Sequence, residues 1–188
     1  MHLVNKEKLL KKREYLIDSF ISMVAERGMA SSGVDSIAKY ADVSKKTIYN
    51  QFGSKKGLAI EAMTRFSEIV QHGWLADKEE IKDPEELLLR FFTELEEAIE
   101  SGMFYGCIFV NICREYPDLD HDLHKIAQEH KNAVRAEIST RLKKYGCNDP
   151  DKLLEIEIIY EGLISKLLVS QDVSLVGKVK KLVLNTLA

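Results

Sequence analysis

The spacing of apolar residues is the feature that most restricts the fold of this 188-residue chain. Long stretches carry apolar side chains three, four or seven positions apart, a repeat that gathers them on one face of an α-helix. Residues 16–24 and 88–99 are two clear examples. No segment of four to eight residues alternates apolar and polar side chains as a half-buried strand does. We therefore predict an all-α fold with about nine helices.

Residues with known roles at helix ends divide these stretches. Asp83-Pro84 and Asp149-Pro150 each place a capping carboxylate before a proline at the first helical position. Gly28 closes the first apolar stripe, as glycine commonly does at a helix C-terminus. Ser32, with Asp35 three residues later, predicts a capping arrangement that opens a short second helix.

Composition narrows the class of protein. With 45% hydrophobic and 30% charged residues, the chain is typical of a globular domain. Its longest run without a charged residue, 101–113, has 13 residues. A membrane-spanning helix needs about 20, so we expect this run in a core and no membrane contact. Residues 1–6 lack the apolar stretch of a secretory signal, and three cysteines (Cys107, Cys113 and Cys147) are too few for a disulfide framework or a zinc site. We expect a cytoplasmic protein without a metal or cofactor.

The formal charge of −3 is distributed unevenly. Residues 1–58 hold 11 Lys or Arg and 6 Asp or Glu, a balance of +5. Residues 59–188 hold 16 and 24, a balance of −8. This asymmetry indicates that the N-terminal part is the one suited to meet a polyanion such as nucleic acid.

Residues 34–52 have the spacing of a helix-turn-helix. The first short helix is expected at 34–40, the turn at 41–43, and the second helix after Ser44, a good N-cap. Ile48 and Phe52 are the strongly apolar residues of the second helix, so we expect them to face inward. The outward face then carries Lys45, Lys46, Thr47, Tyr49, Asn50 and Gln51. Ammonium groups suit phosphates, a threonine methyl suits thymine, and amides pair with adenine, so this face is typical of DNA recognition.

These residues, in this order, resemble the TetR family of bacterial transcriptional regulators. The matching motifs are Ile37-Ala38, Val43-Ser44, Thr47-Ile48-Tyr49 and Phe52-Gly53-Ser54-Lys55. The resemblance is close over about residues 9–58 and implies a three-helix DNA-binding domain at 1–53. It also implies a larger helical domain at 54–188 for effector binding and dimerisation. Gly33 and Asp42 depart from the family pattern, which usually has Thr or Ser and Gly or Asn at these two positions.

The resemblance also implies functional residues. Expected DNA contacts are Ser32, Ser44, Lys45, Lys46, Thr47, Tyr49, Asn50, Gln51 and Lys55, with Lys55 on a phosphate. The last two helices, within residues 151–187, are expected to form a homodimer, because a dimer doubles the base pairs that one short helix can read. An unidentified small-molecule effector would bind between helices. Candidate lining residues are Trp74, Phe91, Phe92, Phe104, Tyr105, Cys107, Phe109 and Tyr160, although each also fits plain core packing.

Several other patterns allow two interpretations. Cys107 could sense oxidants or electrophiles, but no basic residue adjoins it in the sequence, so we favour a small buried side chain. The histidines at 121 and 124, among aspartates, are interpreted as a solvated turn, and His130 as a core residue. Glu157 and Glu161 lack a nucleophile nearby and are interpreted as surface charge.

We therefore predict a homodimeric, ligand-responsive transcriptional regulator, most simply a repressor of a palindromic operator. An all-helical enzyme and a helical interaction module are the alternatives. Against an enzyme, the sequence lacks a Gly-rich phosphate loop and an HExxH pair. Neither the operator nor the effector follows from the sequence.

Overall fold

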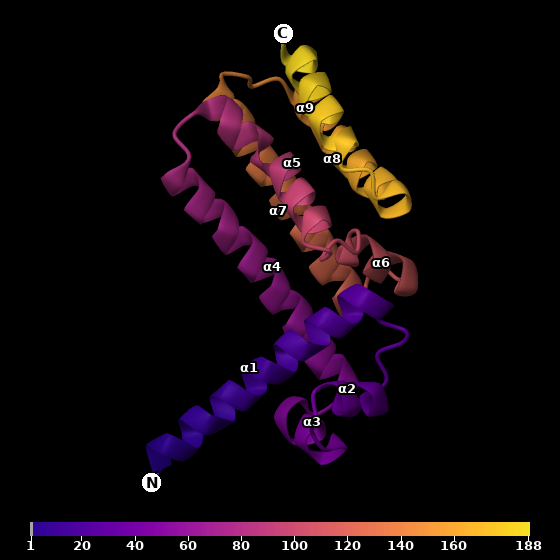
Figure 1. Cartoon of the computed structure of the whole chain (residues 1–188). Coiled ribbons are helices and arrows are strands. Elements are labelled where there is room, and N and C mark those ends of the chain that lie inside the picture. The colour runs from indigo at the N-terminus through magenta and orange to yellow at the C-terminus, as the bar shows by residue number, and fades with distance from the viewer. Residues whose placement is uncertain (1) are drawn as a thin grey trace. The chain divides into compact units, whose positions relative to one another are not determined.

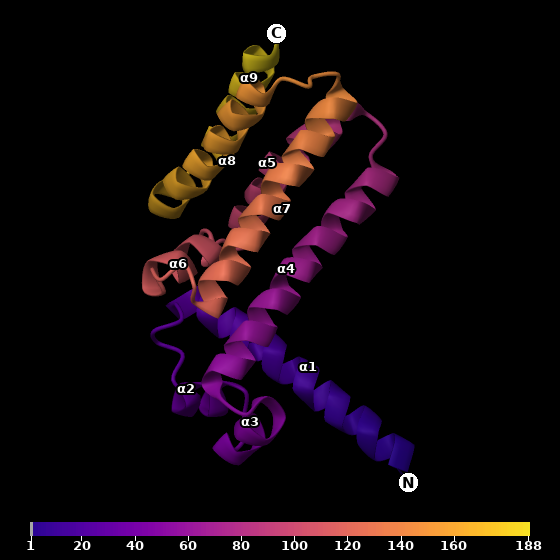
Figure 2. The same cartoon turned by 180° about the vertical axis from the view of Figure 1, so that it is seen from behind.

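The computed structural model of the chain describes residues 2–188, with side chains from residue 11 onward. Over this range it forms nine helices and no strand, which confirms the predicted all-α fold (Figures 1 and 2). The helices are α1 (His2–Arg27), α2 (Val34–Tyr40), α3 (Lys45–Phe52), α4 (Lys55–Glu80), α5 (Pro84–Glu100), α6 (Ile108–Glu115), α7 (Asp122–Tyr145), α8 (Pro150–Ser170) and α9 (Ser174–Leu187). Among the described residues, no helix combines the length and apolar content needed to cross a bilayer.

The chain divides into two compact units, each made of two separate stretches of sequence. Unit 1 comprises Met1–Val70 and Ile108–Glu129, and unit 2 comprises Gln71–Cys107 and His130–Ala188. Helices α4 and α7 therefore contribute residues to both units. The expected division into domains at residues 1–53 and 54–188 remains a prediction.

The predicted caps of α5 and α8 are confirmed. Asp83 accepts a hydrogen bond from the Glu86 N–H at 2.8 Å, and Asp149 accepts one from the Asp151 N–H at 2.8 Å. In both helices proline follows the cap, where it has no amide hydrogen to leave unpaired. These caps fix where α5 and α8 begin.

The start of α2 differs from the prediction. Gly33, and not Ser32, is the N-cap residue, and no side chain caps the helix there. The Ser32 hydroxyl instead donates to the Gly28 carbonyl at 2.9 Å. The reason is the end of α1, where Gly28 adopts a positive φ of 76° and the chain turns back, which brings the Gly28 carbonyl within reach of Ser32. The expected pairing of Ser32 with Asp35 was wrong.

Unit 1 is held together by apolar packing and one arginine. Leu16, Phe20 and Met23 of α1 are fully buried, together with Ile48 of α3. Arg13 pairs with Glu61 of α4 through its two terminal guanidinium nitrogens, and the same guanidinium lies 4.6 Å from the centre of the Phe52 ring. Arg13 therefore joins α1, α3 and α4.

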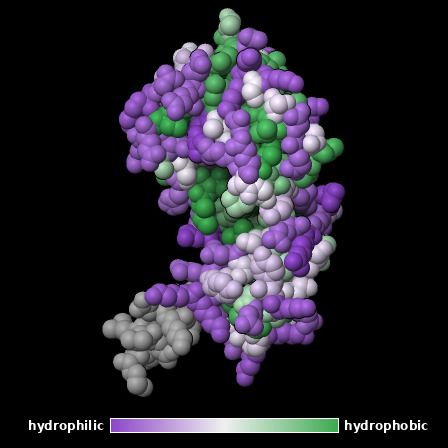
Figure 3. Space-filling view, viewed as in Figure 1, coloured by the Kyte–Doolittle hydropathy of each residue, from purple (hydrophilic) through white to green (hydrophobic). Residues whose placement is uncertain are grey.

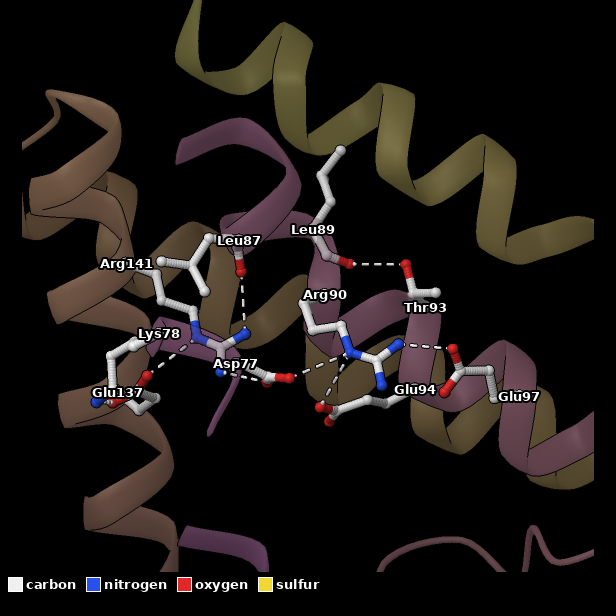
Figure 4. Close-up of polar contacts among 10 residues, drawn as sticks. All are labelled: Asp77, Lys78, Leu87, Leu89, Arg90, Thr93, Glu94, Glu97, Glu137 and Arg141. Atoms are coloured by element: carbon white, nitrogen blue, oxygen red, sulfur yellow. Dashed lines mark hydrogen bonds and ion pairs between the residues drawn. The ribbon is translucent and has the colours of Figure 1, made fainter. Parts of the chain in front are cut away.

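Unit 2 contains a buried ion network that joins α4, α5 and α7 (Figure 4). Arg141 is fully buried, and it donates to Asp77, to Glu137 and to the Leu87 carbonyl, at 3.0, 3.0 and 2.9 Å. Lys78 pairs with Glu137 at 2.7 Å. Because an unpaired buried charge is costly, this network fixes the three helices against one another.

Arg90 extends the network along α5. It hydrogen-bonds Glu97 at 2.6 Å and Asp77 at 3.4 Å, whereas Glu94 lies 3.7 Å away (Figure 4). Glu94 is thus the carboxyl group with the weakest cationic partner in this cluster. Partial burial, with the neighbouring Asp77 carboxylate, raises the pKa of Glu94 to about 7.

Candidate nucleic-acid interface

The turn between α2 and α3 has the geometry that a helix-turn-helix needs. The Ala41 N–H donates to the Ile37 carbonyl and the Val43 N–H to the Ala38 carbonyl, each at 2.9 Å. Asp42 between them has a φ of 50°, in the left-handed region. Aspartate tolerates this region better than most residues, so the departure from glycine or asparagine is accommodated without losing the turn.

Ser44 caps α3, as predicted. Its hydroxyl oxygen accepts a hydrogen bond from the Thr47 N–H at 3.1 Å. The two hydroxyl groups, Ser44 Oγ and Thr47 Oγ1, also lie 2.9 Å apart and hydrogen-bond. The first turn of α3 is therefore fixed before the helix meets any partner.

The inward and outward faces of α3 agree with the sequence analysis. Ile48 is fully buried, and Phe52 is half-buried under the Arg13 guanidinium. In both views α3 lies beside α2 at the outer edge of unit 1 (Figures 1 and 2). The outward residues Lys45, Lys46, Tyr49 and Asn50 are exposed, and Thr47 and Gln51 are half-buried. The helix thus presents a polar and cationic face to solvent.

One lysine on this face of α3 already has an acidic partner within the protein. Lys45 forms an ion pair with Asp35 of α2, and both side chains are well exposed. The hydrogen bond and charge of Asp35 raise the pKa of Lys45, so the amine remains protonated. Solvent screens exposed pairs of this kind, so a phosphate can replace Asp35 at little cost.

The turn into α4 holds Lys55 in a defined place. Ser54 caps α4 by accepting from the Gly57 N–H at 2.9 Å. Lys55 is half-buried, and its ammonium group donates to the Met29 carbonyl at 3.2 Å. Its predicted phosphate contact remains a prediction, as does the DNA contact of Ser32, which is fully buried.

Gly57 is a site residue that the sequence analysis missed. A Cβ atom at this position would lie 2.2 Å from the Phe52 carbonyl oxygen, far inside van der Waals contact. The end of α3 can therefore approach α4 only because residue 57 is glycine. The sequence does place a glycine in the first turn of a predicted helix. Glycine lowers helix propensity, so its presence there indicates that another part of the chain packs closely against it.

The aromatic effector candidates do not all lie in the same unit. Four of them, Trp74, Phe91, Phe92 and Tyr160, form one cluster in unit 2, with ring centres 5.5–5.8 Å apart in successive pairs. Phe109 belongs to unit 1, where it stacks on Phe66 at 5.8 Å. Phe104 is half-buried and Tyr105 is exposed. A pocket of about 260 Å³ between α4 and α7 has Trp74 among its lining residues.

The surroundings of Cys107 correct the expectation that nothing basic lies near it. Lys131 of α7 lies close enough to the Cys107 sulfur to interact with it, and it pairs with Glu161 of α8 at 2.7 Å. Burial alone would lower the pKa of Lys131, but Cys107 and Glu161 outweigh it, so the pKa lies above its usual value. Lys131 follows Cys107 by 24 positions in the sequence. The residues next to Cys107 therefore did not indicate that a cation lies near it.

The histidines have local partners. His121 stacks on Tyr116 at 4.5 Å, and His124 Nδ1 lies 2.7 Å from the Tyr116 carbonyl oxygen. His130 is buried, as predicted for a core residue, and burial with nearby Lys131 lowers its pKa to about 4. Among the side chains that the structure describes, no three His, Cys, Asp or Glu residues gather as a metal site would need.

Comparison with known proteins gives consistent findings. Residues 16–62 match the family described as "Bacterial regulatory proteins, tetR family". The HTH-type transcriptional regulator YjdC of Escherichia coli is 23% identical over 86% of this chain and 85% of its own length. The HTH-type transcriptional repressor NemR of the same species is 24% identical over 74% and 71%.

Solved structures agree with the fold. The TetR-family transcriptional regulator SCO4454 from Streptomyces coelicolor superposes with a TM-score of 0.85 at 20% identity, over 94% of each chain. The reduced form of Escherichia coli NemR gives a TM-score of 0.82 at 18% identity, over 93% of this chain and 96% of its own. At these identities the superpositions establish the shared fold.

Proposed function

Because this chain is a transcriptional regulator of the TetR family, we propose that it is a repressor that binds a palindromic operator as a homodimer and is released by a small-molecule effector. Homologues with this helix-turn-helix are regulators and not enzymes, so the chain is not an enzyme. The observation that carries the proposal is the face of α3, where a capped helix exposes two lysines, a tyrosine and an asparagine. In this reading the protein works in the cytoplasm.

The proposed DNA contacts divide into two classes. Lys45, Lys46, Thr47, Tyr49 and Asn50 would enter the major groove, and Gln51 would lie at its edge. Lys55 would contact a phosphate, with Ser32 and Ser44 as further polar contacts at the starts of α2 and α3. Phosphate contacts supply affinity for any sequence, and base contacts supply the choice of operator.

The proposed dimer forms through α8 and α9, within residues 151–187. Four large apolar side chains are exposed on α8 and one on α9, and Figure 3 shows hydrophobic surface among polar patches in this part of the molecule. These residues are Leu154, Ile158, Leu168, Val169 and Leu182. Packing them against a second copy would bury surface that otherwise faces water, as two helix pairs do in a four-helix bundle.

The proposed effector site lies in the larger domain, at residues 54–188, near the aromatic residues of unit 2. Trp74, Phe91, Phe92 and Tyr160 already meet there, next to Glu94 and Arg141. An apolar molecule could separate these rings and shift the helices that carry them. Effector binding would then change the spacing of the two recognition helices, which couples the two sites.

The test first uses the wild-type protein to select a DNA duplex from random sequences. Binding of that duplex is then measured for the wild type and for Tyr49→Ala. Tyr49 is about half exposed, so its loss leaves the core intact. We expect salt-dependent binding of the wild type with two chains per duplex, and binding at least about tenfold weaker for the variant. Retained affinity in the variant, or a wild type that selects no sequence, contradicts the proposal and favours an interaction module.

A further inference from the structure

Helix α6 belongs to the same compact unit as the DNA-binding helices, although 50 or more residues separate them in sequence. Phe109 of α6 stacks on Phe66 of α4 with the ring planes 17° apart. At the start of α7, Asp122 pairs with Lys56 of α4 at 2.8 Å. Residues 108–129 are therefore packed directly against the elements that carry α2 and α3.

The backbone of one residue in unit 1, Met29, joins three of these elements. The Met29 N–H, in the turn between α1 and α2, donates to the Glu115 carboxylate at the end of α6, at 3.2 Å. The Met29 carbonyl accepts from Lys55 of α4 at 3.2 Å and from the Ser32 N–H at 3.1 Å. Met29 itself is 1% exposed, so water has little access to its backbone.

Glu115 approaches the turn at Gly28. Gly28 has a φ of 76°, and a Cβ there would lie 3.3 Å from the same Glu115 oxygen that accepts the Met29 N–H. The turn is therefore shaped around this carboxylate. If the carboxylate were removed, a buried N–H would be left without its acceptor, and the turn would have to move to reach another one.

We propose that Glu115 is a positioning residue for DNA binding, which holds the turn between α1 and α2 through the Met29 N–H and thereby fixes Lys55, which donates to the carbonyl of the same residue. The expected changes in DNA affinity and in its salt dependence rest on the proposed function. The expected change in amide exchange at residues 28–33 does not.

The test compares Glu115→Ala and Glu115→Met, which remove the acceptor, with Glu115→Gln, which keeps an acceptor oxygen. Glu129→Ala is the charge-matched control, because Glu129 is an exposed carboxylate of unit 1 on α7. Each full-length variant is first checked by thermal unfolding. Glu115→Met preserves side-chain length, so it decides the outcome if the alanine variant fails to fold.

Two quantities are measured on each folded variant. The first is amide exchange in residues 28–33, which we expect to accelerate about tenfold in the Ala and Met variants and to stay at the wild-type rate in Gln and Glu129→Ala. The second is the salt dependence of binding to the selected duplex. We expect the Ala and Met variants to bind about tenfold more weakly, with the slope lowered by about one because Lys55 is displaced, and the Gln variant to recover both.

Equal exchange, affinity and salt slope in Glu115→Met, Glu115→Gln and Glu129→Ala would overturn the inference. A wild type that binds no DNA would instead contradict the proposed function. In that case the exchange of residues 28–33 still decides whether Glu115 holds the turn.

Discussion

Lys45 on α3 and Arg141 on α7 are both paired with carboxylates, but the surroundings of the two pairs are opposite. The side chains of Lys45 and Asp35 are 56% and 77% exposed, whereas those of Arg141 and Asp77 are 0% and 13% exposed. The exposed pair is weak and can exchange its carboxylate for another anion. The buried pair is costly to break and holds α4 and α7 together. The Lys45 cation is therefore available to a partner, whereas the Arg141 cation stabilises the fold.

The largest expected effect comes from breaking the buried network. Arg141→Ala leaves Asp77 and Glu137 without their shared cation, and we expect a loss of about 3–5 kcal/mol in the free energy of unfolding. Urea denaturation followed by circular dichroism measures it. Arg135→Ala is the control, since its pair with Glu157 is partly exposed and should contribute less than about 1 kcal/mol. Equal losses in the two variants would remove the distinction between buried and exposed ion pairs.

A smaller loss is expected where α3 meets α4. Gly57→Ala places a methyl group against the Phe52 carbonyl and should destabilise the protein by about 1–3 kcal/mol. Gly73→Ala, in the same helix, is the control, because nothing described lies within 4 Å of the added atom. There the better helix propensity of alanine should stabilise by up to about 1 kcal/mol. Thermal unfolding of both variants gives the sign of each change.

Lys55 should affect binding more than folding. Lys55→Ala is expected to weaken binding to every duplex and to lower the slope of log affinity against log salt by about one. Lys144→Ala removes an equal charge from an exposed position in unit 2 and should leave the slope unchanged. An unchanged slope for Lys55→Ala would remove Lys55 from the set of phosphate contacts.

The pH dependence of stability should be the mildest effect. Because the pKa of Glu94 is raised from 4.5 to about 7, its contribution is present at acid pH and is lost as the pH rises through that window. His130, whose pKa is lowered from 6.5 to about 4, contributes in the opposite sense as the pH rises. The two slopes oppose one another in the wild type.

Glu94→Gln separates these contributions. The variant should become more stable relative to the wild type as the pH rises from about 4.5 to about 7. In this window the wild type releases a proton from Glu94 when it unfolds, and the variant does not. Melting temperatures of both proteins at each pH provide the difference. A flat difference for Glu94→Gln would show that Glu94 titrates normally.

The parts that the sequence predicted correctly are those in which neighbouring residues determine the structure. The Ser44 cap depends on Thr47 three positions away, and the burial of Ile48 follows from helical spacing. The tolerance of Asp42 for a positive φ is likewise local. These features could be inferred because the interacting groups are close along the chain.

The features that were missed depend on distant contacts. Lys131 reaches Cys107 only when α7 packs beside the segment that carries the cysteine, and Glu115 meets Met29 across 86 positions. The expected Ser32 cap failed for a local reason, because α2 begins one residue later, after Gly33, and the Ser32 hydroxyl donates to the Gly28 carbonyl. Helical periodicity indicates which faces are buried, but it does not say which helix covers which face.

The most direct measurement is a hydroxyl-radical footprint of the wild-type protein on a duplex selected from random sequences. If α3 of two chains enters the major groove, two protected half-sites will appear, related by a two-fold axis and separated by about 10 base pairs or a multiple of it. A single protected site, or no protection at any salt concentration, would contradict the claim that the exposed face of α3 reads an operator as a dimer.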